Sequence, residues 1–176
     1  WRNDQTLDYY YYTPTYFPTL KLEKPNFETI IKNMKSLIEL HLDGVNISTQ
    51  SSKWCESISL ALPKLQVLSL SSCGLTSPFC SSLSRLQFLS KLNLNDNPIS
   101  YLPADFMENA SRLVSLNLGS CNLSGHFPSK IFLLPKMQSI DISYNPNLRG
   151  QLPEFPSNSN LEVLSLSETN FSGKLP

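Results

Sequence analysis

His41 is one of only two histidines in the chain, and its neighbours give it the setting most like a nucleophilic site. Glu39 and Asp43 flank it at alternate positions, so a strand would present all three side chains on one face. Ser69 holds the equivalent position in the next copy of a repeat. Acyl transfer, however, also needs oriented donors for the oxyanion and exclusion of water, which an open strand face does not offer. We therefore expect no enzyme, and interpret these side chains as polar contacts for a partner.

The other ionisable residues give no stronger sign of catalysis. His126 falls in a turn and is interpreted as a solvated loop residue, and Asp141, Glu162 and Glu168 as a solvated acidic edge. The sequence has no phosphate-binding glycine loop and no closely spaced cysteine pair, so we expect neither cofactor nor metal. With 14 basic and 14 acidic residues and no basic stripe, nucleic acid is not expected as a partner.

An internal repeat gives these residues their positions. The motif Leu-x-Leu, with isoleucine in one copy, begins at residues 40, 68, 92, 116, 140 and 164, so the spacings are 28, 24, 24, 24 and 24. Alternating leucines point to one side of a short strand, and such a strand is stable only when stacked on copies of itself. The sequence therefore predicts an α/β leucine-rich repeat solenoid. A parallel β-sheet would line its concave face, with 3-10, short helical and irregular segments on the convex face.

Two further features recur after each predicted strand. The third residue beyond Leu-x-Leu is polar or small, and an asparagine there can point inward and satisfy backbone groups of adjacent turns; the first and last units depart from this rule. The residues at this inward position are Val45, Cys73, Asn97, Cys121, Asn145 and Thr169. A Gly-x-x-Pro turn follows in three units, in Leu123–Pro128, Leu148–Pro153 and Phe171–Pro176, and one extra residue in the fifth unit predicts a small bulge.

If the strands line the concave face, the residues between and beside the leucines face outward. This surface is polar and small-sided, which suits hydrogen bonding to an extended peptide or a sugar chain, partly through water. It lacks the aromatic and arginine anchors of a typical hot spot, so a spacer role for these repeats stays open. The candidate contact residues are Glu39, His41, Asp43, Ser69, Lys91, Asn93, Asn95, Asn117, Asp141, Tyr144 and Ser165.

The four cysteines divide into two pairs. Cys73 and Cys121 occupy the inward position two units apart, which favours buried free thiols. Cys55 and Cys80 fall at similar places on the return segments of adjacent units once a four-residue insertion in the first unit is allowed for. A disulfide between them is one interpretation in an oxidising compartment, and two free thiols are the other.

Four Asn-x-Ser sequons are candidates for N-glycosylation, at Asn46, Asn109, Asn122 and Asn170. Asn46, Asn122 and Asn170 each flank the inward position just past a strand, and Asn109 falls on a return segment, so all could be exposed. Polar loop asparagines are the alternative interpretation. The sequons favour an extracellular protein.

The combined pattern, with glycine and proline at Gly125 and Pro128, resembles the plant-specific leucine-rich repeat. The sequence also resembles the ectodomains of plant receptor-like proteins that act in disease resistance, over about residues 20–176. The segments that carry this resemblance are Leu20–Pro25, Leu42–Ser48, Lys53–Glu56, Leu68–Cys73, Leu152–Pro156 and Phe171–Pro176. The cysteine-paired capping segment with which that family begins is absent. Residues 1–19 do not look like a repeat, and are interpreted as an irregular lead-in or a misjoined segment.

The resemblance implies a fragment, truncated at both ends, of a receptor with a single membrane span and no kinase of its own. Such a receptor would stand at the extracellular face of the plasma membrane, bind a protein, peptide or glycan ligand, and signal through a co-receptor kinase. The fragment itself has no apolar run of the roughly 18 residues that a span requires, and is not expected to contact the membrane. The alternatives are a secreted inhibitor of a pathogen's wall-degrading enzyme and a set of spacer repeats.

Overall fold

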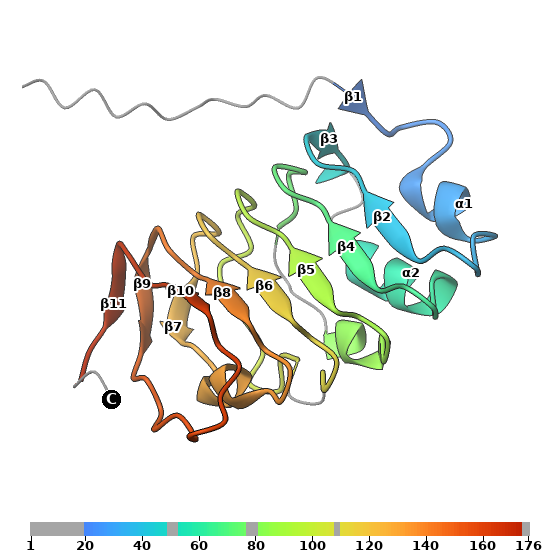
Figure 1. The fold of residues 1–176 in the computed structure, drawn as a ribbon. Helices are drawn as coiled ribbons and strands as arrows, with labels where there is room; N and C mark the ends of the chain where they lie inside the picture. Colours follow the sequence, from blue (N-terminus) through green and yellow to red (C-terminus); the bar gives the residue numbers. More distant parts are fainter. Residues whose placement is uncertain (1–19, 49–52, 77–80, 108–109, 174–176) are drawn as a thin grey trace, which may run out of the picture.

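The computed structural model describes residues 20–48, 53–76, 81–107 and 110–173, and the lead-in of residues 1–19 lies outside this part of the chain. Six short strands form one parallel sheet, which runs along the whole described array (Figure 1). In sheet order they are β2 (Glu39–His41), β4 (Val67–Ser69), β5 (Lys91–Asn93), β6 (Ser115–Asn117), β8 (Ser139–Asp141) and β10 (Val163–Ser165).

The register of this sheet follows the repeat. Leu92 of β5 lies opposite Leu68 on one side and Leu116 on the other, and the same in-phase pairing continues to both ends of the sheet. The inner side chains are fully buried in the middle units, whereas Leu40 and Leu164 at the two ends are only partly buried. The predicted solenoid and its leucine column are therefore confirmed.

The inward asparagines hold adjacent turns together. The side-chain oxygen of Asn97 accepts from the backbone N–H groups of Cys73 and Leu75 at 3.0 and 2.9 Å. Its amide nitrogen donates to the carbonyls of Leu70, Leu94 and Asn95 at 2.7, 2.9 and 3.1 Å. Asn145, two units further along, makes the equivalent five bonds. Each asparagine thus satisfies buried backbone groups of two consecutive turns, as predicted.

The inward cysteines make a reduced version of the same contacts. The thiol of Cys73 donates to the carbonyl of Leu42 at 3.0 Å, and that of Cys121 to the carbonyl of Leu94 at 3.1 Å. The N–H group of each cysteine donates to the side-chain oxygen of the asparagine in the next unit. Cysteine and asparagine alternate in the four middle units. A cysteine side chain offers no such oxygen to the unit before it, where Ile47 and Ile99 donate to the backbone carbonyls of Cys73 and Cys121 instead.

The residue before each inward position adopts a left-handed backbone conformation. It is glycine in the first unit, Gly44 at φ 74°, and non-glycine in every later one. The later residues are Ser72, Asp96, Ser120, Tyr144 and Glu168, with φ between 53° and 57°. Left-handed conformations are unfavourable for residues with a Cβ, so the stacked hydrogen bonds on either side must hold this turn in place.

Short helices occupy the side of the solenoid opposite the sheet (Figure 1). Helix α1 (Phe27–Ile31) precedes β2, the first strand of the six-stranded sheet along the chain, and α2 (Trp54–Ala61) lies between β2 and β4. The later units carry the 3-10 helices η2 (Ser81–Arg85) and η3 (Ser129–Leu133). The longer of the two α-helices, α2, thus falls in the 28-residue unit, whose longer return segment has room for two helical turns. No helix among the described residues is long and apolar enough to cross a membrane.

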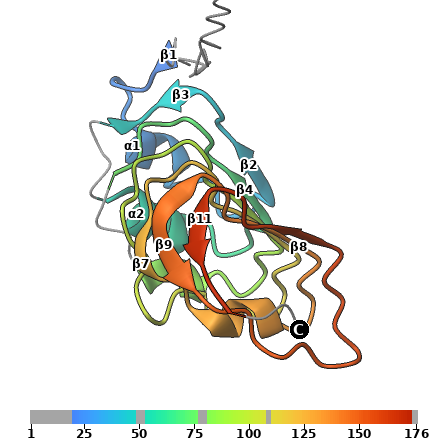
Figure 2. The same cartoon turned by 90° about the vertical axis from the view of Figure 1, so that its left-hand side faces the viewer.

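A second sheet forms where the Gly-x-x-Pro turns occur. It contains β7 (Ser124–His126), β9 (Asn145–Gly150) and β11 (Thr169–Phe171), in the order β11-β9-β7. Figure 2 shows these strands on one flank and the first sheet on the other. The register between β9 and β11 shifts at Thr169 and Asn170, which confirms the predicted irregularity. The second and third units, which lack this glycine, have no such strand among their described residues. In the first unit β3 (Val45–Asn46) pairs with β1 (Leu20–Lys21) in a separate two-stranded sheet.

Aromatic side chains fill the space behind the second sheet. The ring of Phe132 lies between those of Phe127, Phe155 and Phe171, with centroid distances of 5.2, 6.4 and 6.1 Å. Gly150 is required here, since a Cβ atom at this position would lie 2.6 Å from the Phe171 ring. Alternation along β11 then places Asn170 and Ser172 on the outer side of the strand.

Candidate ligand-binding face

Eight of the eleven candidate contact residues lie in the strands of the six-stranded sheet, and Asp43, Asn95 and Tyr144 follow a strand end. Lys91, Glu39, His41 and Asp43 are exposed, and Tyr144 is 61% exposed at the margin. The asparagines and Asp141 are half-buried between neighbouring strands, as is Ser165. Val163, which was not among the candidates, is 53% exposed on the outermost strand. The face is therefore polar in its centre, with Tyr144 and Val163 as larger groups towards the β10 end.

Ser69 departs from the expected exposure. Its side chain is buried at 7% exposure, because its hydroxyl donates to Asp43 Oδ1 at 2.7 Å and accepts from the Asn93 amide at 3.0 Å. The same Asp43 oxygen accepts from the N–H of Ser71 at 2.7 Å. These bonds tie three successive units together across the face, so Ser69 supports the surface rather than presenting a free group to a ligand.

The central asparagines and aspartate have a structural role that sequence reasoning missed. Asn93, Asn117 and Asp141 each accept a hydrogen bond from the backbone N–H two residues later, at 3.0 to 3.3 Å. Asp141 Oδ1 also accepts from the Ser143 hydroxyl at 2.6 Å. Such bonds end each strand in a side-chain turn, which asparagine and aspartate favour. Their recurrence every 24 residues at a strand end was the available signal.

His41 is not arranged for nucleophilic chemistry. Its Nε2 atom lies 3.3 Å from Glu39 Oε2, and both side chains are more than half exposed. The Ser69 hydroxyl donates directly to Asp43, so the histidine does not mediate between the serine and that carboxylate. The histidine, serine and aspartate that a catalytic triad requires are therefore present, but their hydrogen bonds do not link them in the order of a triad.

A shallow hollow of about 290 Å³ lies over strands β2 to β6. Its apolar lining comes from Val67, Leu68 and Leu92, and its polar lining from His41, Ser69, Lys91, Asn93, Ser115 and Asn117. The lysine is the one cationic side chain in this lining. The hollow lies at the low end of the volume range of small-ligand pockets, and it offers one cation, amides and hydroxyls to an extended ligand.

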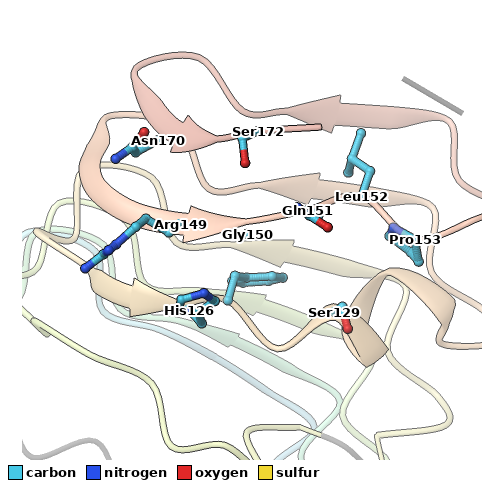
Figure 3. Close-up of a pocket in the computed structure, with 10 residues that line it drawn as sticks. His126, Ser129, Arg149, Gly150, Gln151, Leu152, Pro153, Asn170 and Ser172 are labelled. Atoms are coloured by element: carbon cyan, nitrogen blue, oxygen red, sulfur yellow. The ribbon is translucent and has the colours of Figure 1, made fainter. Parts of the chain in front are cut away.

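The predicted glycosylation sites have different surroundings. Asn46 is half-buried in β3, and its side-chain oxygen accepts from the N–H of Ser48 at 2.9 Å. Asn122 is exposed in a turn, and Asn170 is exposed in β11, at a hollow of about 660 Å³ on the second sheet (Figure 3). Asn109 lies outside the described residues. Modification of these sites stays a prediction.

Among the described cysteines, Cys73 and Cys121 are free and buried, and Cys55 is disulfide-bonded. Its expected partner, Cys80, lies outside the described residues, so this pairing stays a prediction. Non-reduced, denatured protein should expose two titratable thiols, and reduced protein four. In the folded protein Cys73 and Cys121 should resist alkylation. Four thiols before reduction would contradict the pairing.

Burial raises the pKa of both Cys73 and Cys121 to about 12, from an ordinary value of 9.0. Between pH 9 and pH 12 the two thiols therefore stay protonated in the folded state, whereas the same thiols in the unfolded chain lose their protons. Their contribution to stability is complete below pH 9 and is lost as the pH rises towards 12, by up to about 1.4 kcal/mol per pH unit for each thiol. Urea unfolding at pH 8 to 11 should show this decline. In the double variant Cys73→Ala, Cys121→Ala the slope should be shallower by up to about 2.7 kcal/mol per pH unit; equal slopes would contradict the prediction.

The comparisons with known proteins agree with this architecture. Residues 64–86 and 112–134 match the Leucine Rich Repeat family model. A search of the curated proteins finds no match. Among solved structures, the plant peptide hormone receptor RGFR1 in complex with RGF2 is 36% identical, with a TM-score of 0.69. The ectodomain of the Arabidopsis receptor kinase HAESA, with an extended IDA peptide hormone ligand, is 31% identical, with the same TM-score.

Each of these two matches covers 81% of this chain, but only 22% and 23% of the receptor chains. The chain therefore spans less than a quarter of their length. The shorter ectodomain of the receptor kinase SOBIR1 from Arabidopsis thaliana is 26% identical, with a TM-score of 0.57, over 65% of this chain and 64% of that one.

The fold and the repeated motif define a leucine-rich repeat protein. Its repeats are similar to those that build the ectodomains of plant receptor kinases. Folds of this class generally serve as binding scaffolds and not as enzymes.

Proposed function

We propose that this chain is part of the ectodomain of a plant cell-surface immune receptor-like protein, and that it contributes to recognition of a protein, peptide or glycan ligand. The observation that carries the proposal is the polar face of the six-stranded sheet, with Lys91 beside a hollow lined by amides and hydroxyls. Receptors of similar fold are in complex with peptide hormones, and one of them also with the co-receptor SERK1. The full-length protein would signal through such a co-receptor kinase from the plasma membrane.

The test uses the full-length gene expressed in plant cells that are treated with a fungal culture filtrate. The double variant Lys91→Glu, Ser115→Glu places two carboxylates in the hollow, and should weaken ligand binding by about fivefold or more, the effect of losing about 1 kcal/mol of contact. Its dose–response curve for the oxidative burst should shift accordingly. Lys136→Glu reverses an exposed lysine outside the hollow, as Lys91→Glu does inside it; this control should leave the curve in place.

Each outcome has a distinct meaning. An unchanged response in the double variant favours a spacer role for these repeats. No response in the unmodified receptor contradicts the immune role. Direct inhibition of a wall-degrading enzyme in the filtrate by the purified protein favours the secreted inhibitor, which remains the second candidate because its scaffold would be the same.

A further inference from the structure

A hollow of about 660 Å³, larger than the one of about 290 Å³ on the predicted ligand face, lies on the outer side of the second sheet. Figure 3 shows side chains of three strands or strand ends around it. Asn170 of β11 pairs in register with Arg149 of β9, and His126 of β7 pairs with the same arginine on its other side. The hollow therefore has a row of three outward polar side chains along one border.

The rest of the lining combines polar and apolar groups. Gln151 and Ser172 continue the outward positions of the two strands, and Leu152 and Pro153 supply apolar surface. The volume of about 660 Å³ lies within the range of small-ligand sites, which spans roughly 300 to 1,000 Å³. A guanidinium, an amide and a hydroxyl beside apolar carbon atoms suit the hydroxyl and acetamido groups of a sugar and the faces of its rings.

An N-glycosylation sequon of the chain lies at this hollow. Asn170 belongs to the sequon Asn170-Phe171-Ser172, and both its asparagine and its serine line the hollow. The phenylalanine between them packs inward on Phe127 and Phe132, which fixes the strand and keeps the asparagine outward. Asn122 belongs to a similar sequon, is also exposed, and does not line the hollow. The sequons at Asn170 and Asn122 therefore differ in their surroundings: only Asn170 lies beside a hollow that an attached sugar could occupy.

We propose that an N-linked oligosaccharide on Asn170 lies in this hollow, with its first two N-acetylglucosamine residues against Arg149, Gln151 and Leu152. The attached sugar then covers the outer side of the second sheet and stabilises the C-terminal units. The inference rests on the extracellular location in the proposed function. It does not depend on which ligand the protein recognises.

The test compares two sites within one molecule. The protein is secreted from plant cells and treated, still folded, with an endoglycosidase that cleaves between the first two sugars, and release is followed at each glycopeptide by mass spectrometry. Release at Asn170 should be about tenfold slower than at Asn122, equivalent to about 1.4 kcal/mol of contact. The double variant Arg149→Ala, Gln151→Ala keeps the sequon and should remove this protection. Lys136→Ala, an exposed control elsewhere, should not.

Stability gives a second readout. Asn170→Gln should lower the Tm by about 2–4 °C relative to Asn122→Gln, the shift expected for about 1 kcal/mol in a chain of this size. Ser172→Thr retains the sequon and should keep the unmodified Tm. Equal release rates with equal Tm values would overturn the inference, as would an unmodified Asn170 beside a modified Asn122. Absence of sugar from every sequon would count against the extracellular location as well, and so against the proposed function.

Discussion

Replacement of Asn97 by alanine is expected to destabilise the solenoid by about 2–5 kcal/mol. The side chain makes five hydrogen bonds to backbone groups of two turns, and it is fully buried. Alanine would leave the N–H groups of Cys73 and Leu75 without their acceptor in a place that water does not reach. Each buried group that loses its partner costs about 1–3 kcal/mol. The carbonyl of Leu94 is less affected, because it also accepts from the thiol of Cys121.

Urea unfolding measures this loss, and hydrogen exchange locates it at the amides of Cys73 and Leu75. Asn97→Cys should cost less than alanine, because a thiol at this position can still donate to a carbonyl of the preceding turn, as it does in Cys73 and Cys121. Asn160→Ala is the matched control: this exposed asparagine donates only to the carbonyl of Pro135, and its loss should cost under about 1 kcal/mol. Similar losses for Asn97 and Asn160 would contradict the capping role.

The features of the fold that come from one residue position repeated in every unit could be predicted from the sequence. The leucine column and the inward asparagines recur at a fixed period, and a solenoid turns a fixed period into direct contact between neighbouring units. Cys73 and Asn97 therefore meet although they lie 24 residues apart. The second sheet likewise forms where Gly125 and Gly150 permit it.

The features that depend on side-chain geometry between units could not be predicted in this way. Burial of Ser69 results from its contacts with Asp43 and Asn93 on either side, which no pattern within one unit contains. The left-handed turn residues give no signal either, since Tyr144 and Glu168 are ordinary residues in an unusual conformation. The hollow at Asn170 depends on the shifted register of β9 and β11, and the sequence indicated only that some irregularity would occur there.

These differences affect the candidate site more than the fold. Five of the eleven predicted contact residues support the face itself, because Asp43, Ser69, Asn93, Asn117 and Asp141 hydrogen-bond to its backbone or to neighbouring side chains. Substituting them would alter the surface and its support together. Lys91 and Ser115 also line the hollow, but no side-chain hydrogen bond within the face is described for either of them. Substituting these two residues therefore tests binding without removing a support of the surface.

Replacement of Leu116 by alanine is the second change with a large expected effect, a loss of about 2–5 kcal/mol. Leu116 lies in β6, between Leu92 and Ile140 in register, and has no exposed surface. Truncation there opens a cavity in the column that stacked neighbours on both sides cannot close. Leu164→Ala in β10 removes the same atoms from a side chain that is only half-buried, so it should cost less than half as much. Urea unfolding of the two variants compares them directly. Equal losses would mean that burial within the column does not determine the contribution of each leucine. A larger loss for Leu116 is expected because the energy of the fold lies in contacts between successive units, and the middle units have such contacts on both sides.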